Sequence, residues 1–321
     1  MEIGNSIDCG NVHDPLILCP YCGGSLCGKC GVCSVCGQVV PSEDGVLRFL
    51  GGKDAFYEGA YRAQVHFNRN ALKHPLGKLI LPFINFGYIK LILDTVPPGS
   101  RVLELGCGGG MQLAGEHYIV SALDLSLSSL KGTPSSYKNK IHANALEVEF
   151  LPGSFDAVFG SCFFEHLAHA HKRALIEKIF RWLRPGGHLI MLFDTESLNP
   201  FFEWLRKAPV LYRQCIVEHD GHVGLEPVSI NLKLFREQGF EEIRGIGLNR
   251  TLQHLPVYAW IAPYGQVNRS ISVLSRFFDR IGRNILISRM YTASLHIWDI
   301  SLGRLFPLDW SRLYLGCWRR P

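Results

Sequence analysis

Short apolar runs alternate with amphipathic stretches from Arg101 onward. The runs have the length and the β-branched and aromatic content of buried strands, and six of them stand out: Arg101–Leu105, Ile119–Leu123, Ala157–Ser161, His188–Phe193, Phe240–Gly247 and Arg312–Trp318. Apolar residues at helical spacing occur between these runs, most clearly over Lys172–Leu183 and Ser229–Gln238. Strands that alternate with helices favour a parallel sheet that is covered on both faces. We therefore predict an α/β fold with a doubly wound, mostly parallel sheet.

The same pattern divides the chain into parts. Residues 1–50 are rich in cysteine and poor in long apolar runs, which predicts a small metal-held module. Residues 51–93 have the pattern of aromatic-rich helices that cover a core. Pro97-Pro98-Gly99 then breaks the chain. We predict that residues 94–321 form the core domain, with an insertion at about 248–311 between its last two strands.

The insertion contains an amphipathic stretch over Val267–Met290. Its apolar residues recur at three- and four-residue spacing, at Ile271, Leu274, Phe277, Phe278, Ile281 and Ile285. Most of its arginines lie elsewhere on the same helical wheel, at Arg269, Arg276, Arg280 and Arg283. A basic amphipathic helix can lie on an anionic membrane, or it can pack on the core with its arginines in solvent. In either position the insertion can form a lid that contributes to specificity.

Composition and charge exclude some classes of protein. Apolar residues make up 47% and charged residues 19% of the 321 residues, which is incompatible with a disordered chain. Between Tyr264 and Pro321 there are nine arginines and three aspartates, a net of +6, within a total of +5. A nucleic-acid-binding protein usually spreads its positive charge more widely. Nucleic acid is therefore a disfavoured partner.

The sequence shows neither a secretory signal nor a spanning segment. Met1–Asn5 contains no basic and no apolar region. The longest apolar stretch, Leu76–Leu93, is interrupted by Lys78, Pro82 and two further breaks, whereas a spanning helix needs about 20 mostly apolar residues. We expect a cytoplasmic protein that contacts a membrane, if at all, through the surface of the basic insertion.

A glycine-rich loop follows the first predicted strand of the core. Residues 102–110 read VLELGCGGG, so that Glu104 lies in the strand and four glycines come after it. Such glycines let a ligand approach the main chain closely. The dinucleotide-binding fingerprint is an alternative, but its third glycine would fall at Met111. Asp124 ends the next strand, where its carboxylate can accept hydrogen bonds from both hydroxyls of a ribose.

Further motifs follow in order along the chain. Asn144-Ala145 comes after the third strand, residues 152–159 open the fourth, and the sequence LRPGGHLIML over 183–192 contains a turn and the fifth strand. Together with the glycine loop and Asp124, this set resembles the class I S-adenosylmethionine-dependent methyltransferases. The resemblance implies a Rossmann-like core and S-adenosylmethionine as the cofactor.

The resemblance also implies which residues contact the cofactor. Those around its methionine part would be Glu104, Gly106, Cys107, Gly108 and Gly110. Asp124 and Leu125 would lie at the ribose, Asn144 and Ala145 would lie beside the adenine, and Ser161 would be a further contact. The family more often has Asp where Asn144 stands. The segment between Gly110 and Asp124 is also shorter than usual, which leaves the length of the first helix open.

Seven of the eleven cysteines lie between Cys9 and Cys36. Two CxxC knuckles, each followed by Gly, supply four thiolates for a structural Zn²⁺, and the predicted ligands are Cys19, Cys22, Cys33 and Cys36. Cys27 and Cys30 form a third pair, so the choice of ligands stays open at this point. The stretch resembles the zinc-ribbon modules at the front of some bacterial methyltransferases.

Two histidines are candidates for the chemistry. Glu165-His166 lies just after the fourth strand, and His166 is our candidate for a base or an acceptor-positioning group. Alternatively the pair only fixes the loop beside the cofactor, as a similar Glu-His pair often does in small-molecule methyltransferases. His222 precedes the last core helix and can reach the acceptor, or it is an ordinary loop histidine. Tyr57 and Tyr61 can cover the cofactor or merely pack.

The expected function is methyl transfer from S-adenosylmethionine to a small molecule, a sugar or a lipid-linked saccharide. A ribosomal RNA acceptor is a second hypothesis, because some zinc-ribbon methyltransferases modify ribosomal RNA. The near-neutral core and the lack of an Asn/Asp-Pro-Pro-Tyr type motif argue against it. A third hypothesis is a non-catalytic adaptor that binds the cofactor and docks a partner through its zinc ribbon.

Overall fold

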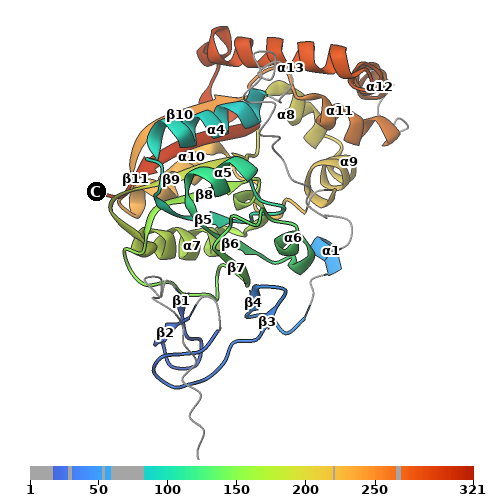
Figure 1. Cartoon of the computed structure of the whole chain (residues 1–321). Helices are drawn as coiled ribbons and strands as arrows, with labels where there is room; N and C mark the ends of the chain where they lie inside the picture. The colour runs from blue at the N-terminus through green and yellow to red at the C-terminus, as the bar shows by residue number, and fades with distance from the viewer. Residues whose placement is uncertain (1–16, 28–30, 53–54, 59–82, 220, 265–268) are drawn as a thin grey trace, which may run out of the picture.

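A nine-stranded sheet runs through the molecule (Figure 1). The computed structural model describes residues 17–27, 31–52, 55–58, 83–219, 221–264 and 269–321. The strands of the sheet are β3 (Ser42–Glu43), β4 (Val46–Arg48), β5 (Arg101–Leu105), β6 (Ile119–Asp124), β7 (Asn139–His142), β8 (Phe155–Ser161), β9 (Leu183–Asp194), β10 (Glu241–Leu248) and β11 (Leu313–Arg319). Their spatial order is β10-β11-β9-β8-β5-β6-β7-β4-β3.

The six strands from β4 to β9 run parallel to one another, whereas β3 is antiparallel to β4 and β11 is antiparallel to both β9 and β10. The predicted mostly parallel sheet is therefore confirmed. From β5 the chain proceeds through β6 to β7 in one direction, and from β8 to β9 in the other. In such sheets ligands bind outside the carboxyl ends of the strands, at the point where the order reverses. Here that point lies between β5 and β8.

Helices cover both faces of the sheet. One face carries α4 (Phe83–Thr95), α5 (Gln112–His117) and α6 (Leu127–Lys131), and the other carries α7 (His169–Trp182) and α10 (Val228–Glu237). The predicted helices at 172–183 and 229–238 are confirmed, and α5, whose length the sequence left open, has six residues. In α7 the buried residues Leu175, Ile176, Ile179 and Trp182 recur at helical spacing, so that one side of the helix packs on the sheet.

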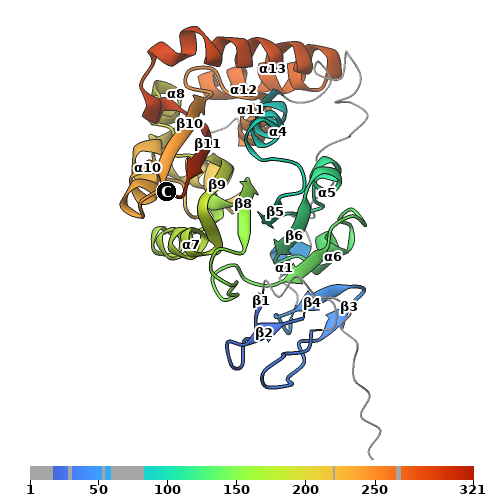
Figure 2. The same cartoon turned by 60° about the vertical axis from the view of Figure 1, so that its left-hand side comes forward.

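The N-terminal module joins this sheet. Its first hairpin pairs β1 (Ile17–Leu18) with β2 (Ser25–Leu26), and its second pairs β3 with β4 through a turn at Asp44-Gly45. Because β4 runs parallel to β7, with Val46 opposite Lys140 and Arg48 opposite His142, the second hairpin extends the core sheet at its edge. Both views place the module at the end of the molecule opposite α13 (Ile285–Ile300) (Figures 1 and 2).

Helices also lie between β10 and β11. They are α11 (Leu255–Ile261), η3 (Ala262–Tyr264), α12 (Arg269–Gly282), α13, η4 (Leu302–Leu305) and η5 (Leu308–Trp310). The first two α-helices share an apolar cluster with α8 (Pro200–Arg206), α9 (Pro209–Tyr212) and η2 (Arg213–Glu218), which follow β9. The segments after β9 and after β10 therefore build one helical layer beyond the sheet.

The predicted amphipathic helix over 267–290 is wrong as a single element. The chain breaks between α12 and α13, where the Asn284 side chain accepts hydrogen bonds from the N–H groups of Leu286 and Ile287 and so caps a new helix. The apolar stripe is also split, because Ile271 is buried while Phe277 is 59% exposed. In the part of the chain that the structure describes, no helix combines the length and the apolar character needed to cross a membrane.

Some predicted positions lie outside the described residues. Tyr61 and Cys30 are among them, as is most of the predicted helical segment 51–93. The described parts of that segment include α1 (Ala55–Glu58), which carries Tyr57, and α4.

Candidate active site

The glycine loop leaves the carboxyl end of β5 with a main-chain conformation that favours glycine. Gly106, Gly108 and Gly110 all have left-handed backbone conformations, with φ of +58°, +52° and +73°. At Gly106 an added Cβ would lie 2.6 Å from the ring of Phe163, which follows β8. The loop therefore packs directly against the neighbouring strand's carboxyl end, at the reversal point of the sheet. A side chain at this position would have no room.

Two buried acids border the loop. Asp124, at the end of β6, accepts hydrogen bonds from the N–H groups of Gly108 at 2.8 Å and Ser126 at 2.7 Å. Glu104, in β5, accepts a hydrogen bond from the Tyr137 hydroxyl at 2.5 Å. Burial raises the pKa of Glu104 to about 7 and also raises the pKa of Asp124.

These acids lack a basic partner. Among the described residues no lysine or arginine forms an ion pair with either carboxylate. A ligand with positive charge and hydroxyl groups would complete the site, because it would supply the missing countercharge and use the remaining lone pairs of Asp124. S-adenosylmethionine carries a sulfonium, an ammonium and a ribose, so these residues fit it.

The other predicted cofactor contacts are placed as follows. Cys107 is buried in the glycine loop, and Ala145 is buried after β7. Leu125, just after β6, and Ser161, at the end of β8, are half-buried. Asn144 is engaged locally, because its side chain accepts a hydrogen bond from the N–H of Leu146 and donates one to Glu147. The structure thus brings the glycine loop and Asp124 together. The assigned contacts with each part of the cofactor stay predictions.

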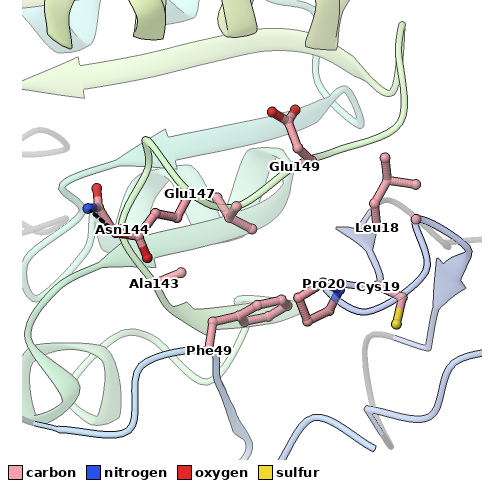
Figure 3. A pocket seen from close by; sticks show the side chains of 10 residues that line it. Leu18, Cys19, Pro20, Phe49, Ala143, Asn144, Glu147 and Glu149 are labelled. Atoms are coloured by element: carbon pink, nitrogen blue, oxygen red, sulfur yellow. Dashed lines mark hydrogen bonds between the residues drawn. The ribbon is translucent and has the colours of Figure 1, made fainter. Parts of the chain in front are cut away.

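Asn144 also faces a pocket of about 370 Å³ at the junction with the N-terminal module (Figure 3). The pocket is lined by Leu18, Cys19, Pro20, Gly23, Phe49, Ala143, Asn144, Glu147, Val148 and Glu149. The N-terminal module therefore lies next to the chain segment that follows β7.

A second group of titratable residues lies after β8. Glu165 and His166 belong to η1 (Phe164–His166), and His222 comes from the loop after η2. One ligand atom of each residue lies within 4.8 Å of the others, and the two imidazole rings are 5.2 Å apart. Tyr57 lies edge-on to His166 at 6.4 Å. The two predicted catalytic histidines, His166 and His222, are 56 positions apart in the sequence but are neighbours in space.

Burial dominates the electrostatics of this group. Burial and the charge of Asp194 raise the pKa of the fully buried Glu165 to about 8. Burial lowers the pKa of His222 to about 4, although Asp194 opposes this shift. Glu165 is thus protonated and His222 neutral at neutral pH in the unliganded protein. A protonated carboxyl and a neutral imidazole can both form hydrogen bonds with a small polar ligand or exchange a proton with it.

Sequence reasoning missed three residues beside this group. Asp194 ends β9, and its carboxylate lies 3.4 Å from Nε2 of His222 and 3.2 Å from the buried guanidinium of Arg312. His254, from the insertion, is near enough for Asp194 to affect its pKa, which burial lowers to about 4. An acid at the end of an apolar strand was the signal that identified Asp124, and it could have identified Asp194. Arg312 and His254 carry no such signal.

The loop that carries His222 is held tightly against η1. The N–H of Gly224 donates to the carbonyl of Glu165 at 2.8 Å, and an added Cβ at Gly224 would lie 1.8 Å from the carbonyl oxygen of Leu167. The carbonyl of Gly224 also accepts a hydrogen bond from the buried ammonium of Lys172 at 2.6 Å. The relative position of His166 and His222 is therefore set by main-chain contacts.

The four predicted metal-binding thiols converge in the N-terminal module. The Sγ atoms of Cys19, Cys22, Cys33 and Cys36 all lie within 4.8 Å of one another. Two main-chain N–H groups point to these sulfurs, from Gly24 to Cys22 and from Val35 to Cys33, both at 3.4 Å. Cys27 is not part of the cluster. Four sulfurs with amide donors form a suitable donor set for a tetrahedral zinc.

Comparison with known proteins identifies the central part of the chain. Residues 103–191 match the family described as "Methyltransferase domain". The chain is 26% identical over 171 residues to phosphoethanolamine N-methyltransferase 3 of Arabidopsis thaliana. This match covers 50% of this chain and 32% of that protein. It is 33% identical over 121 residues to a ubiquinone biosynthesis O-methyltransferase of Paracidovorax citrulli, covering 33% and 49%. The chain thus spans a third to a half of the length of these curated relatives.

Among solved structures, geranyl diphosphate C-methyltransferase from Streptomyces coelicolor matches with a TM-score of 0.48 and 15% identity, covering 81% of this chain and 87% of that one. A TM-score of this size adds no support, so the assignment depends on the domain match and the sequence relatives. The domain match and the sequence relatives support an S-adenosylmethionine-dependent methyltransferase domain over residues 103–191.

Proposed function

We propose that the whole protein transfers a methyl group from S-adenosylmethionine to an oxygen of a small molecule, a sugar or a lipid-linked saccharide. The observation that carries this proposal is the pair of buried acids, Glu104 and Asp124, which border the glycine loop and form no ion pair with any lysine or arginine that the structure describes. A cationic nucleoside is the ligand that this arrangement favours. The titratable group of Glu165, His166 and His222 supports an oxygen acceptor, because a hydroxyl must lose a proton when it is methylated.

Bound S-adenosylmethionine would supply a methyl group that is already activated by the positive sulfur. The protein's own residues would then align the acceptor and exclude water, and alignment can contribute about 7 kcal/mol or more. His166 and His222 are held beside Glu165 by the contacts of the 221–224 loop, and they would orient the acceptor hydroxyl or accept its proton. The helical layer that contains α11 would cover the acceptor.

We also propose that Cys19, Cys22, Cys33 and Cys36 hold a structural Zn²⁺. Four thiolates leave no open coordination position, so this site would stabilise the fold and take no part in methyl transfer. Cys27 lies outside the cluster and is not one of the proposed ligands.

A membrane surface is our proposed partner of the outer helical layer. Four apolar side chains of α13 are exposed at helical spacing. They are Leu286, Met290, Ile297 and Ile300, with exposed fractions of 65%, 63%, 59% and 40%. The adjacent α12 exposes Arg276 and Arg280 beside Phe277. Apolar side chains next to arginines suit an anionic lipid surface. The arrangement agrees with an acceptor that is attached to a lipid.

Two other functions are less well supported. An RNA acceptor would need a basic surface around the glycine loop, whereas acids border this loop. The exposed arginines of α12 lie beside apolar side chains. An adaptor that only binds the cofactor would have no use for the arrangement of Glu165, His166 and His222. Both hypotheses make predictions that differ from those of a small-molecule enzyme, as follows.

Calorimetry with S-adenosylmethionine tests the proposal. We expect the wild type to bind it and Asp124→Ala to bind at least about tenfold more weakly, because the ribose and the Gly108 N–H lose their acceptor. Asp94→Ala, which removes an exposed acid of α4, is the matched control and should bind normally. Failure of the wild type to bind would refute the enzyme hypothesis. Binding without turnover on hydroxylated acceptors would favour the adaptor, and affinity for RNA that falls steeply with salt would favour the second enzyme hypothesis.

A further inference from the structure

We propose that Glu165, His166 and His222 form a binding site for one divalent transition-metal cation, separate from the cysteine cluster. The three residues come from η1 and from the loop after η2, and one ligand atom of each lies within 4.8 Å of the other two. Glu165 is fully buried, and neither of its carboxylate oxygens accepts a hydrogen bond of normal geometry from any residue that the structure describes. A buried carboxylate without a donor is costly unless it is protonated or meets a cation.

The tautomer of His166 suits a ligand. Its Nδ1 lies 3.1 Å from the carbonyl oxygen of Gly221, which can only accept, so Nδ1 carries the proton and Nε2 presents its lone pair. A ring N–H that donates to a main-chain carbonyl is the usual outer contact of a metal-binding histidine, because it fixes both the ring orientation and the tautomer. The buried ring of His222 lies 5.2 Å from the ring of His166, and one of its nitrogens lies within 4.8 Å of a ligand atom of each of the other two residues.

The site is also rigid and bordered by a further acid. The N–H of Gly224 donates a hydrogen bond to the carbonyl of Glu165 at 2.8 Å, which fixes the loop that carries His222 to η1. Asp194 lies 3.4 Å from Nε2 of His222, where it adds negative potential for a cation or orients the ring. Rigid supporting contacts of this kind hold metal ligands in place.

The donor set points to the class of cation and ligand. Two imidazoles and one carboxylate suit divalent first-row metals and leave coordination positions open. Oxygen atoms of the acceptor could occupy those positions, which favours an acceptor with two adjacent oxygens, such as a vicinal diol. This role in acceptor binding rests on the proposed methyl transfer, whereas the cation site itself does not.

Titration of the full-length, zinc-loaded protein with Mn²⁺, followed by the electron paramagnetic resonance signal of the free ion, tests the site. Mn²⁺ binds weakly to thiolates and will not displace zinc from the cysteine cluster. We expect one bound Mn²⁺ per chain and at least about tenfold weaker binding for Glu165→Gln and for His222→Gln. His169→Gln, which removes an exposed histidine of the adjacent helix, should leave the Mn²⁺ affinity unchanged.

Calorimetry with S-adenosylmethionine on the same samples reports whether each variant is folded and keeps the two proposals apart. A wild type that binds S-adenosylmethionine but not Mn²⁺ overturns the cation site and leaves the proposed function standing. Equal Mn²⁺ affinity in wild type and Glu165→Gln also overturns it. A wild type that binds Mn²⁺ but not S-adenosylmethionine would overturn the proposed function alone. If Glu165→Gln fails to fold, the His222→Gln variant decides.

Discussion

Single residues fix the glycine loop at the end of β5. Gly106 combines a left-handed backbone with close contact to Phe163, and Asp124 ties the same loop to β6 through the N–H of Gly108. Glu104 lies underneath as a buried acid. Each of these positions has a separate physical requirement, so each can be tested by one substitution.

Gly106→Ala should destabilise the protein more than Gly99→Ala does. Both glycines have a left-handed conformation, with φ of +58° and +82°, but only Gly106 has atoms within 4 Å of an added Cβ. We expect about 1–2 kcal/mol of backbone cost at both positions and about 1–3 kcal/mol more at Gly106 from the clash with Phe163. Urea unfolding of the two variants measures the difference. Equal free energies of unfolding would show that Phe163 does not restrict the loop.

The affinity for S-adenosylmethionine should depend on the ionisation of Glu104. Burial raises the pKa of Glu104 to about 7, so below that pH its carboxyl is neutral and attracts a cationic ligand less. We expect the affinity to fall about tenfold per pH unit once the pH is well below 7, because the proton must first leave. Calorimetry over this range measures the slope. Glu104→Gln should bind more weakly and lose this dependence, and a wild-type affinity independent of pH would contradict the prediction.

The same shift predicts how stability changes with pH in the absence of the cofactor. Glu104 ionises near its ordinary value of 4.5 in the unfolded chain, but near 7 in the folded one. The folded state therefore binds the extra proton between these two values, and its stability from this group is present below 4.5 and is lost as the pH rises through about 7. Denaturant titrations of wild type and Glu104→Gln should converge at low pH and diverge above it.

At the scale of helices and strands, the N-terminal module and the core are one sheet. The β3–β4 hairpin pairs with β7 through three residues on each strand, and the N–H of Phe49 adds a hydrogen bond to the carbonyl of His142 at 3.0 Å. The proposed zinc ion would hold together the module that carries this hairpin. Loss of the metal should therefore be felt in the core, beyond the module itself.

Chelation of zinc should increase hydrogen exchange in β7 as well as in β4. Without the metal the hairpin loses its support, and β7 becomes the edge strand of the sheet. We expect at least about tenfold faster exchange of the β7 amides, with the central β8 unchanged. Mass spectrometry of the exchanged protein measures this. Cys19→Ser should reproduce the effect, whereas Cys27→Ser should keep both the zinc and the protection; equal zinc loss in the two variants would contradict the ligand set.

The whole molecule has two dissimilar ends. The cysteine module lies at one end and α13 at the other (Figure 2), with the sheet between them. The insertion supplies both the apolar outer face of α13 and His254, which lies near Asp194 in the interior. One segment thus links a surface suited to lipids with the residues around the proposed acceptor site.

Vesicle binding tests the outer face. We expect the protein to sediment with vesicles that contain phosphatidylserine and much less with phosphatidylcholine alone, since arginines add about 1 kcal/mol each near an anionic surface. Leu286→Ser combined with Met290→Ser should reduce binding at every lipid composition, and Arg276→Gln combined with Arg280→Gln should reduce it only for anionic vesicles. Ile243→Ser, which removes an exposed apolar residue of β10, is the control. Equal binding by all variants would refute a membrane role for α12 and α13.

Local sequence determined much of this protein. Apolar runs and their spacing predicted six strands of the core sheet, two of the helices and the mostly parallel arrangement, because each signal depends on neighbours within one or two turns of chain. The order of the glycine loop and Asp124 predicted the cofactor site, since consecutive parallel strands end at the same edge. The break at Asn284 escaped prediction, because a cap decides it and the apolar spacing continues across it.

The tertiary structure decided which distant residues meet. Glu165, His222, Asp194, His254 and Arg312 come from five segments, and no local pattern relates them. Their convergence depends on the reversal of strand order between β5 and β8 and on the antiparallel return of β11, which brings Arg312 beside the end of β9. The pairing of β4 with β7 was likewise invisible in sequence. Strand pairing and loop contacts are chosen by the total burial they achieve across the chain, so no single stretch of sequence contains them.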